Sequence, residues 1–278
     1  MIELLHLSYI SGWRRIKHHI KYPVNFAGMI LSSLLSLALF ALFLPILDLD
    51  VVEEATDTRN LAGFMFLGIA FNSFNFVALQ GSSMYLESDM QLGKLEYSFT
   101  CPISRYKYIF SNALGVTAIQ TLFFLPMFAL AHVLVGFHYS LLDFCLALFA
   151  TVIAILVLIQ IGVAFSALVL RYTKIYSIFG VTDSIMRFVG GSYVPVQTFP
   201  VFLQVFALFL PNIFGIDLLR VHLLHTTPIL AEFVGDEHLA IFLEWAILIG
   251  EFVLFYLLAR IAVQAGERAG LQKGFYRL

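Results

Sequence analysis

Six long apolar stretches constrain this chain more than any other feature of its sequence. They fall near residues 24–47, 61–84, 108–135, 143–170, 175–194 and 239–262. A helix needs about 20 apolar residues to cross the hydrocarbon core of a bilayer. Only 12% of the 278 residues are charged, about half the share of soluble domains, so the chain cannot cover a water-facing surface. The sequence predicts an all-α integral membrane protein with six transmembrane helices.

The basic residues predict how these helices are oriented. Most of the 16 lysine and arginine residues lie before the first stretch, between the second and third, between the fourth and fifth, or after the sixth. Cytoplasmic loops carry such an excess of positive charge. We therefore expect a multi-pass protein of the plasma membrane with both termini in the cytoplasm. The net charge of -2 gives no electrostatic basis for binding nucleic acid.

Residues 1–22 form one amphipathic segment, which we treat as separate from the transmembrane domain at 23–278. Apolar residues recur in it at spacings of three and four, as in a helix with one apolar stripe: Ile2, Leu5, Tyr9, Trp13, Ile16 and Ile20. Basic residues occupy much of the remaining surface. This pattern is typical of a helix that lies in the headgroup plane of a membrane, with its cations toward anionic lipid.

The region between the fifth and sixth stretches, residues 195–238, differs from the rest of the chain. Four prolines punctuate it, and its apolar runs are too short to cross a bilayer. We expect a re-entrant helical hairpin on the outer side of the membrane. His222 and His225 stand three residues apart in it, but no third ligand is evident, so no metal is expected.

Several polar side chains fall within the predicted spans, where they are costly unless they are partnered or face water. Asn72 and Asn75 share one broad face of the second span and either join helices or line a translocation path. Asp183 and Arg187 lie four residues apart in the fifth span, where side chains meet along a helix. They form either a functional site or a self-neutralising pair that stabilises a subunit interface. Glu251 lies deep in the sixth span.

Glu244 shares a helical face with Glu251, because seven residues separate the two. Its position near the outer end of the sixth span predicts a carboxyl that solvent can reach. Glu251 is the more interesting of the two, as either a hydrogen-bonded structural carboxyl or a proton-coupling group.

The segment from Glu87 to Arg105 is a polar interval that keeps an apolar stripe. Leu95, Phe99 and Ile103 recur at four-residue spacing between Gly93 and Pro102. An amphipathic loop outside the membrane usually docks against a partner. The chain has no nucleotide-binding loop, no nucleophile elbow and no zinc-protease motif, so we do not expect it to be an enzyme.

This segment resembles the cytoplasmic loop of the ABC type-2 exporter permeases. The family carries an acidic stretch, then G-T-L-E, and then T-P-I-S-R, and here Gly93, Leu95 and Glu96 match the first motif. The second motif matches in the four residues from Pro102 to Arg105, with Cys101 inserted after Thr100. The family also carries a later motif of two prolines followed by Asp-x-x-Arg. Here it is matched by Pro200, Pro211, Asp217 and Arg220.

The resemblance implies a permease that pairs with a second copy or a close relative and with two cytoplasmic ATPase subunits, which bind ATP and Mg. The loop 85–107 would carry a coupling helix seated in a groove of the ATPase. The residues that the resemblance assigns to this contact are Glu87, Gly93, Leu95, Glu96, Phe99 and Pro102. Aspartate at Leu95 and Phe99 is then expected to abolish transport and to leave membrane insertion intact. The transport path would lie between two permeases.

Two other classes of function remain open from the residues alone. A secondary transporter or channel would use Asp183, Arg187 and Glu251 as a proton or ion relay. A membrane-bound enzyme acting on lipid-linked substrates would need clustered carboxylates or histidines at one interface. The one acidic cluster lies at residues 48–57 and contains no histidine.

Overall fold

The computed structural model describes residues 2–24, 61–95, 103–136, 138–169 and 176–273, with a few isolated positions between them. In these residues every regular element is a helix, which confirms the all-α prediction. Three of the helices are long and apolar enough to cross a membrane, over Gly63–Gln91, Leu141–Val169 and Glu237–Arg268. The predicted first span and the acidic loop after it lie almost wholly outside the described residues.

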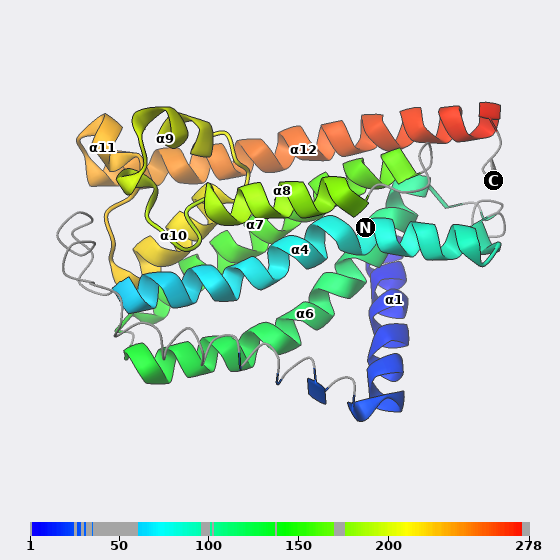
Figure 1. The fold of residues 1–278 in the computed structure, drawn as a ribbon, viewed down its shortest axis with the longest axis horizontal. Coiled ribbons are helices and arrows are strands. Elements are labelled where there is room, and N and C mark those ends of the chain that lie inside the picture. The colour runs from blue at the N-terminus through cyan, green and yellow to red at the C-terminus, as the bar shows by residue number, and fades with distance from the viewer. Residues whose placement is uncertain are drawn as a thin grey trace.

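Four long helices form the body of the molecule, and each covers one predicted span. They are α4 (Leu61–Gln91), α6 (Arg105–Val135), α7 (Leu141–Val169) and α12 (Glu237–Lys273). They run side by side, with α4, α7 and α12 in one direction and α6 in the opposite direction (Figure 1), so that α4 ends where α6 begins. The helices α4 and α12 continue seven and eleven residues past the predicted ends of their spans, because no proline follows directly after the apolar run in either.

Residues of the predicted fifth span and outer region form shorter elements. The described helix α8 (Tyr176–Phe188) ends six residues before the predicted end of the fifth span, because Gly190 and Gly191 follow. Beyond it lie a 3-10 turn and three further helices: η2 (Val196–Thr198), α9 (Val201–Ala207), α10 (Ile213–Leu224) and α11 (Ala231–Val234). They gather at the end of the bundle where α12 begins (Figure 1).

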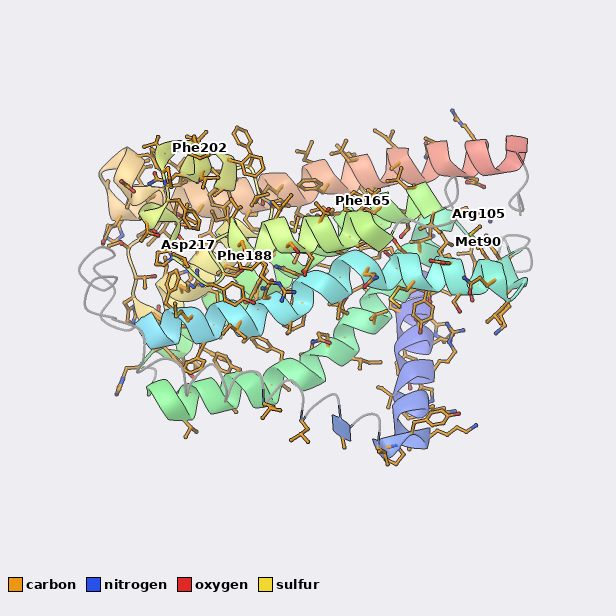
Figure 2. The ribbon with its side chains drawn as sticks, in the orientation of Figure 1. Met90, Arg105, Phe165, Phe188, Phe202 and Asp217 are labelled. Carbon is orange, nitrogen blue, oxygen red and sulfur yellow. The ribbon has the colours of Figure 1, made fainter. Side chains whose placement is uncertain are left out.

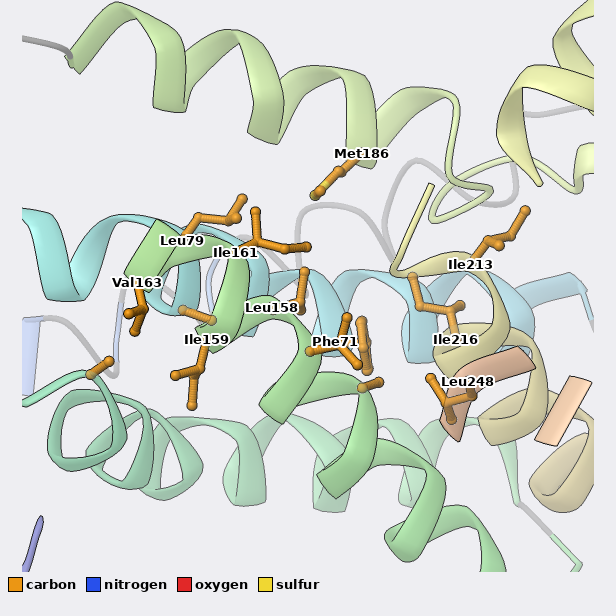
Figure 3. Packing of buried hydrophobic residues seen from close by; sticks show 14 of the residues in the cluster. Phe71, Leu79, Leu158, Ile159, Ile161, Val163, Met186, Ile213, Ile216 and Leu248 are labelled. Carbon is orange, nitrogen blue, oxygen red and sulfur yellow. The ribbon is translucent and has the colours of Figure 1, made fainter. Parts of the chain in front are cut away.

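The helix α7 lies at the centre of the packing, against α4, α6, α10 and α12. Its buried positions include many small residues, which let neighbouring backbones approach closely. A Cβ on Gly162 of α7 would lie 2.3 Å from the carbonyl oxygen of Ala78 in α4. Leu158 and Ile161 of α7 contribute to the apolar core that α4, α8 and α10 complete (Figure 3). Helix contacts of this kind place the buried polar residues described below.

The N-terminal helix α1 (Ile2–Lys21) lies crosswise to the long helices, at the end where α4 finishes (Figure 1). It contacts α6 through its small residues: Ser11 Oγ donates to Asn112 Oδ1 at 3.0 Å, and Gly12 passes over Gly115. Its apolar stripe points elsewhere, since Tyr9 and Ile20 are 65% and 69% exposed. The stripe is therefore free to contact lipid, as an interfacial helix requires.

Candidate coupling site and buried polar residues

Arg220 is the most extensively bonded side chain at the predicted outer end of the bundle. It is 2% exposed and donates to three main-chain carbonyls, those of Phe64, Gly191 and Ser192, at 2.8 to 3.2 Å. The guanidinium also lies 3.4 Å from the centroid of the Phe64 ring, in a cation–π contact. Arg220 therefore joins the start of α4, the turn after α8, and α10.

Gly68 of α4 makes room for this junction. A Cβ at this position would lie 1.8 Å from the carbonyl oxygen of Ser192 and 2.4 Å from Nη2 of Arg220. Only a residue without a side chain lets the turn after α8 approach α4 so closely.

Asp217, one turn before Arg220, meets Glu244 of α12 in a buried pair of carboxyl groups. Asp217 Oδ2 accepts from the N–H of Ile229 at 2.8 Å, and Glu244 Oε1 accepts from the N–H of Leu230 at 3.0 Å. The two carboxyl groups lie close enough for their charges to interact, so burying both as anions would be costly. Glu244 Oε2 has no hydrogen-bond partner among the described residues. Glu244 is fully buried, and the prediction that solvent reaches its carboxyl is wrong, because residues after α10 fold back over it.

Asn72 and Asn75 hydrogen-bond to each other within α4. Asn75 Nδ2 donates to Asn72 Oδ1 at 2.6 Å, and both side chains are buried. Asn72 Nδ2 and Asn75 Oδ1 have no partner among the described residues. A buried amide group without a partner is costly, so this donor and this acceptor are suited to a further polar contact with a ligand, water or another helix.

Asp183 and Arg187 form an ion pair on α8. Arg187 Nη2 lies 2.6 Å from Asp183 Oδ2, and the arginine side chain is more exposed than that of the aspartate. Tyr193, beyond the end of α8, also interacts electrostatically with Arg187. The opposite charges neutralise each other at close range, which lowers the cost of placing them at membrane depth.

Glu251 stands apart from that pair. Its Oε2 is buried and has no hydrogen-bond partner within the described part of the chain. No described contact joins Glu251 to Asp183 or Arg187, so the three charges do not form a continuous relay there.

The predicted coupling segment begins on the last turns of α4. Glu87 lies on that helix, where its Oε1 accepts from Gln91 Nε2 at 3.2 Å. The helix ends in a turn at Gly93, whose φ of 65° is in the left-handed region, as glycines that terminate helices commonly are. Figure 2 places Met90 near this end beside Arg105 of α6, and Asp217 toward the opposite end of the bundle. Glu96, Phe99 and Pro102 lie outside the described residues.

Leu95 does not lie on a free surface. It is 1% exposed and packs in the same apolar cluster as Leu86 and Ile109. Aspartate at Leu95 would therefore disturb the packing of the fold, so this variant would not separate a docking contact from folding. The four-residue spacing correctly identifies an apolar stripe, but Leu95 packs against its own chain. The exposed apolar residue of the turn is Leu92, at 61%.

Two contacts join the helix ends on either side of the segment. Tyr108 of α6 donates from its hydroxyl to Asp89 Oδ2 of α4. Arg105 at the start of α6 pairs with Glu267 of α12, with 3.2 Å between Nε and Oε1. These two contacts connect the ends of α4, α6 and α12.

Comparison with known proteins decides the family. Residues 7–224 match the profile of the ABC-2 type transporter family, which covers most of the chain. The chain belongs to the ABC-2 type transporter family. It is therefore a membrane protein and the permease part of a transporter. A search of curated protein sequences found no significant match.

The matched residues of this ABC-2 permease include both ends of the bundle described above. The motif residues Asp217 and Arg220 occupy structural positions at the end where α12 begins. There Asp217 anchors the backbone after α10, and Arg220 joins α10 to α4. Sequence reasoning did not identify Leu92, because one exposed leucine in a turn has no recurring pattern. It also did not find the contact of Asp217 with Glu244, which no local spacing predicts.

Proposed function

We propose that the chain is the transmembrane subunit of an ATP-driven exporter. In this proposal it pairs with a second copy or a close relative, and with two cytoplasmic ATPase subunits that bind ATP and Mg. The ATPase subunits supply the motion, and the permease pair encloses the path. The family assignment supports this proposal, since ABC-2 membrane domains are permease parts of transporters.

The observation that carries the coupling mechanism is the continuity of α4 with the turn at Gly93. The helix extends seven residues beyond its predicted span, about 10 Å at 1.5 Å per residue, and the exposed Leu92 follows directly. Hydrogen bonding between Tyr108 and Asp89 holds the start of α6 to the same end. An ATPase that displaces this turn would thus move two membrane helices as a rigid pair.

We place the transport path on the side of α8 and α4. In α8 the apolar side chains of Val181, Ile185 and Phe188 are exposed, which suits contact with the second permease. On α4, Asn72 Nδ2 and Asn75 Oδ1 are amide atoms without a hydrogen-bond partner among the described residues. The alternative of a secondary transporter or channel has less support, because Asp183 and Arg187 neutralise each other and Glu251 has no described contact with them.

The experiment compares two exposed apolar residues at opposite ends of the permease. Leu92→Asp introduces a charge into the proposed docking surface, and Phe233→Asp, on the exposed side of α11, is the matched control. Each variant is purified from native membranes through a tag on the permease. The ATPase subunit that co-purifies is quantified, and its ATP hydrolysis is measured.

The proposal predicts that Leu92→Asp reduces the co-purified ATPase about tenfold, as expected when a buried interface contact is replaced by a charge. Phe233→Asp should retain the ATPase at the level of the unsubstituted chain. Equal recovery and equal hydrolysis in both variants would contradict docking at this turn.

A further inference from the structure

A cavity of about 380 Å³ lies between α6, α7 and α12, at the end of the bundle where α6 begins. Its volume falls within the range of small-molecule sites, roughly 300–1,000 Å³. None of the side chains that line it is acidic, and two are basic. The lining residues are Ser104, Tyr106, Lys107, Phe110, Gln160, Phe252, Tyr256 and Arg260.

The cavity is basic at one end and aromatic at the other, and both α6 and α12 contribute to this arrangement. On α12, Arg260 lies two turns beyond Phe252, about 12 Å along the helix axis. On α6, Lys107 lies one turn closer to the helix start than Phe110. Because the start of α6 and the last turns of α12 lie at the same end, the two cations are near one end of the cavity and the two phenylalanines near the other.

Between these two ends, the residues that line the cavity are fixed by contacts with one another. Tyr106 donates from its hydroxyl to Gln160 Oε1 at 2.8 Å, and its ring meets the Tyr256 ring edge-on with centroids 5.7 Å apart. Burial raises the pKa of Tyr106 to about 12, so its hydroxyl keeps the proton it donates. Arg260 Nη1 donates to the Tyr256 hydroxyl at 3.2 Å.

The acidic residue that follows Arg260 along α12 is Glu267, and it is paired with Arg105. The residues that line the cavity include two cations and no acid, so its basic end favours an anion. The aromatic end favours an apolar group attached to that anion.

We propose that this cavity binds the headgroup of an anionic phospholipid from the predicted cytoplasmic leaflet. The phosphate lies between Lys107 and Arg260, and the first carbons of the acyl chains lie against Phe110 and Phe252. Basic pockets between membrane helices on the cytoplasmic side bind anionic headgroups in this way. The inference depends on the membrane placement of α6 and α12 and not on ATPase docking.

The test uses the purified full-length chain in detergent, without ATPase or nucleotide. Short-chain phosphatidylglycerol, short-chain phosphatidylcholine and inorganic phosphate are titrated separately. Binding is followed by native mass spectrometry and by the melting temperature. The variants are Lys107→Ala with Arg260→Ala, and Arg268→Ala as the matched control. Arg268 is exposed on α12 and does not line the cavity.

Phosphatidylglycerol is expected to bind about tenfold more tightly than phosphatidylcholine, because two cations contact its anionic headgroup. The double variant should lose this preference, and Arg268→Ala should retain it. Equal binding of the two lipids to the unsubstituted chain would overturn the proposal whatever the variants do. So would phosphate that stabilises the chain as strongly as phosphatidylglycerol, since the ligand would then be a free anion. Retention of the preference by the double variant would overturn it as well.

Discussion

The Arg220 guanidinium donates a 3.0 Å hydrogen bond from Nη2 to the main-chain carbonyl of Phe64, which lies 156 residues earlier in the chain. The bond joins α10 to the first turn of α4. The same side chain reaches the carbonyls of Gly191 and Ser192. Because backbone carbonyls buried in a membrane protein need partners, Arg220 permits the irregular turn after α8 to lie inside the bundle.

Replacement of Arg220 by lysine should destabilise the chain. An ammonium group keeps the charge but cannot span three carbonyls that a planar guanidinium contacts together. Buried groups would lose partners, at a cost of about 3 kcal/mol. The melting temperature of the purified Arg220→Lys variant checks this, with Arg268→Lys on the exposed side of α12 as control. Equal melting of the two variants would show that the three carbonyls do not depend on the guanidinium.

Gly68→Ala should weaken the same junction. The new Cβ would overlap the carbonyl oxygen of Ser192, and the backbone must shift to relieve the overlap, at a cost of roughly 1–3 kcal/mol. Gly250→Ala in α12 is the control, since nothing lies within 4 Å of its added Cβ. Thermal unfolding should separate the two variants, with only Gly68→Ala melting lower. A Gly68→Ala protein that melts no lower than Gly250→Ala would mean that α4 and the turn do not pack this closely.

Glu244→Gln should be far better tolerated than Glu244→Ala. The glutamine oxygen can accept from the N–H of Leu230, and the uncharged amide places no second charge beside Asp217. Alanine leaves the N–H of Leu230 without this partner and should cost about 1–3 kcal/mol. Melting temperatures of both variants provide the measurement. If glutamine is as damaging as alanine, the hydrogen bond from Leu230 is not what Glu244 contributes to stability.

Asp183→Asn alone should harm the chain more than Asp183→Asn combined with Arg187→Gln. The single change leaves a cation at membrane depth without its counter-charge, whereas the double change removes both charges. A double-mutant cycle on melting temperature should give a coupling of about 1–3 kcal/mol. Additive effects would argue that the 2.6 Å pair contributes no net stability.

Local patterns predicted the helices and several of their boundaries. The apolar runs located α4, α6, α7 and α12, and the glycines at 190 and 191 marked a break after α8. Hydropathy placed the end of the second span near residue 84, but α4 continues to Gln91, because helix propensity depends on the absence of breakers and not on apolarity. Gly93 was the true stop signal.

The polar network at the end of the bundle where α12 begins could not be predicted from spacing. Arg220 and Phe64 are joined by tertiary packing, and Glu244 is buried because residues 229 and 230 fold over it. The same reason explains Leu95: helical periodicity identifies an apolar stripe but does not say whether that stripe faces a partner or the chain's own core. The ion pair of Asp183 and Arg187, by contrast, followed directly from a four-residue spacing.

Docking of the segment after α4 on an ATPase can be tested with the two native cysteines. Cys101 lies in this segment, Cys145 lies near the start of α7 at the other end of the bundle, and both are exposed. A maleimide carrying a photoreactive group is attached in native membranes to a chain that retains only one of them. Docking at this segment predicts that Cys101 forms a cross-linked adduct with a protein that carries a nucleotide-binding loop, and that Cys145 forms none. The same adduct formed equally from both cysteines, or from Cys145 alone, would contradict it.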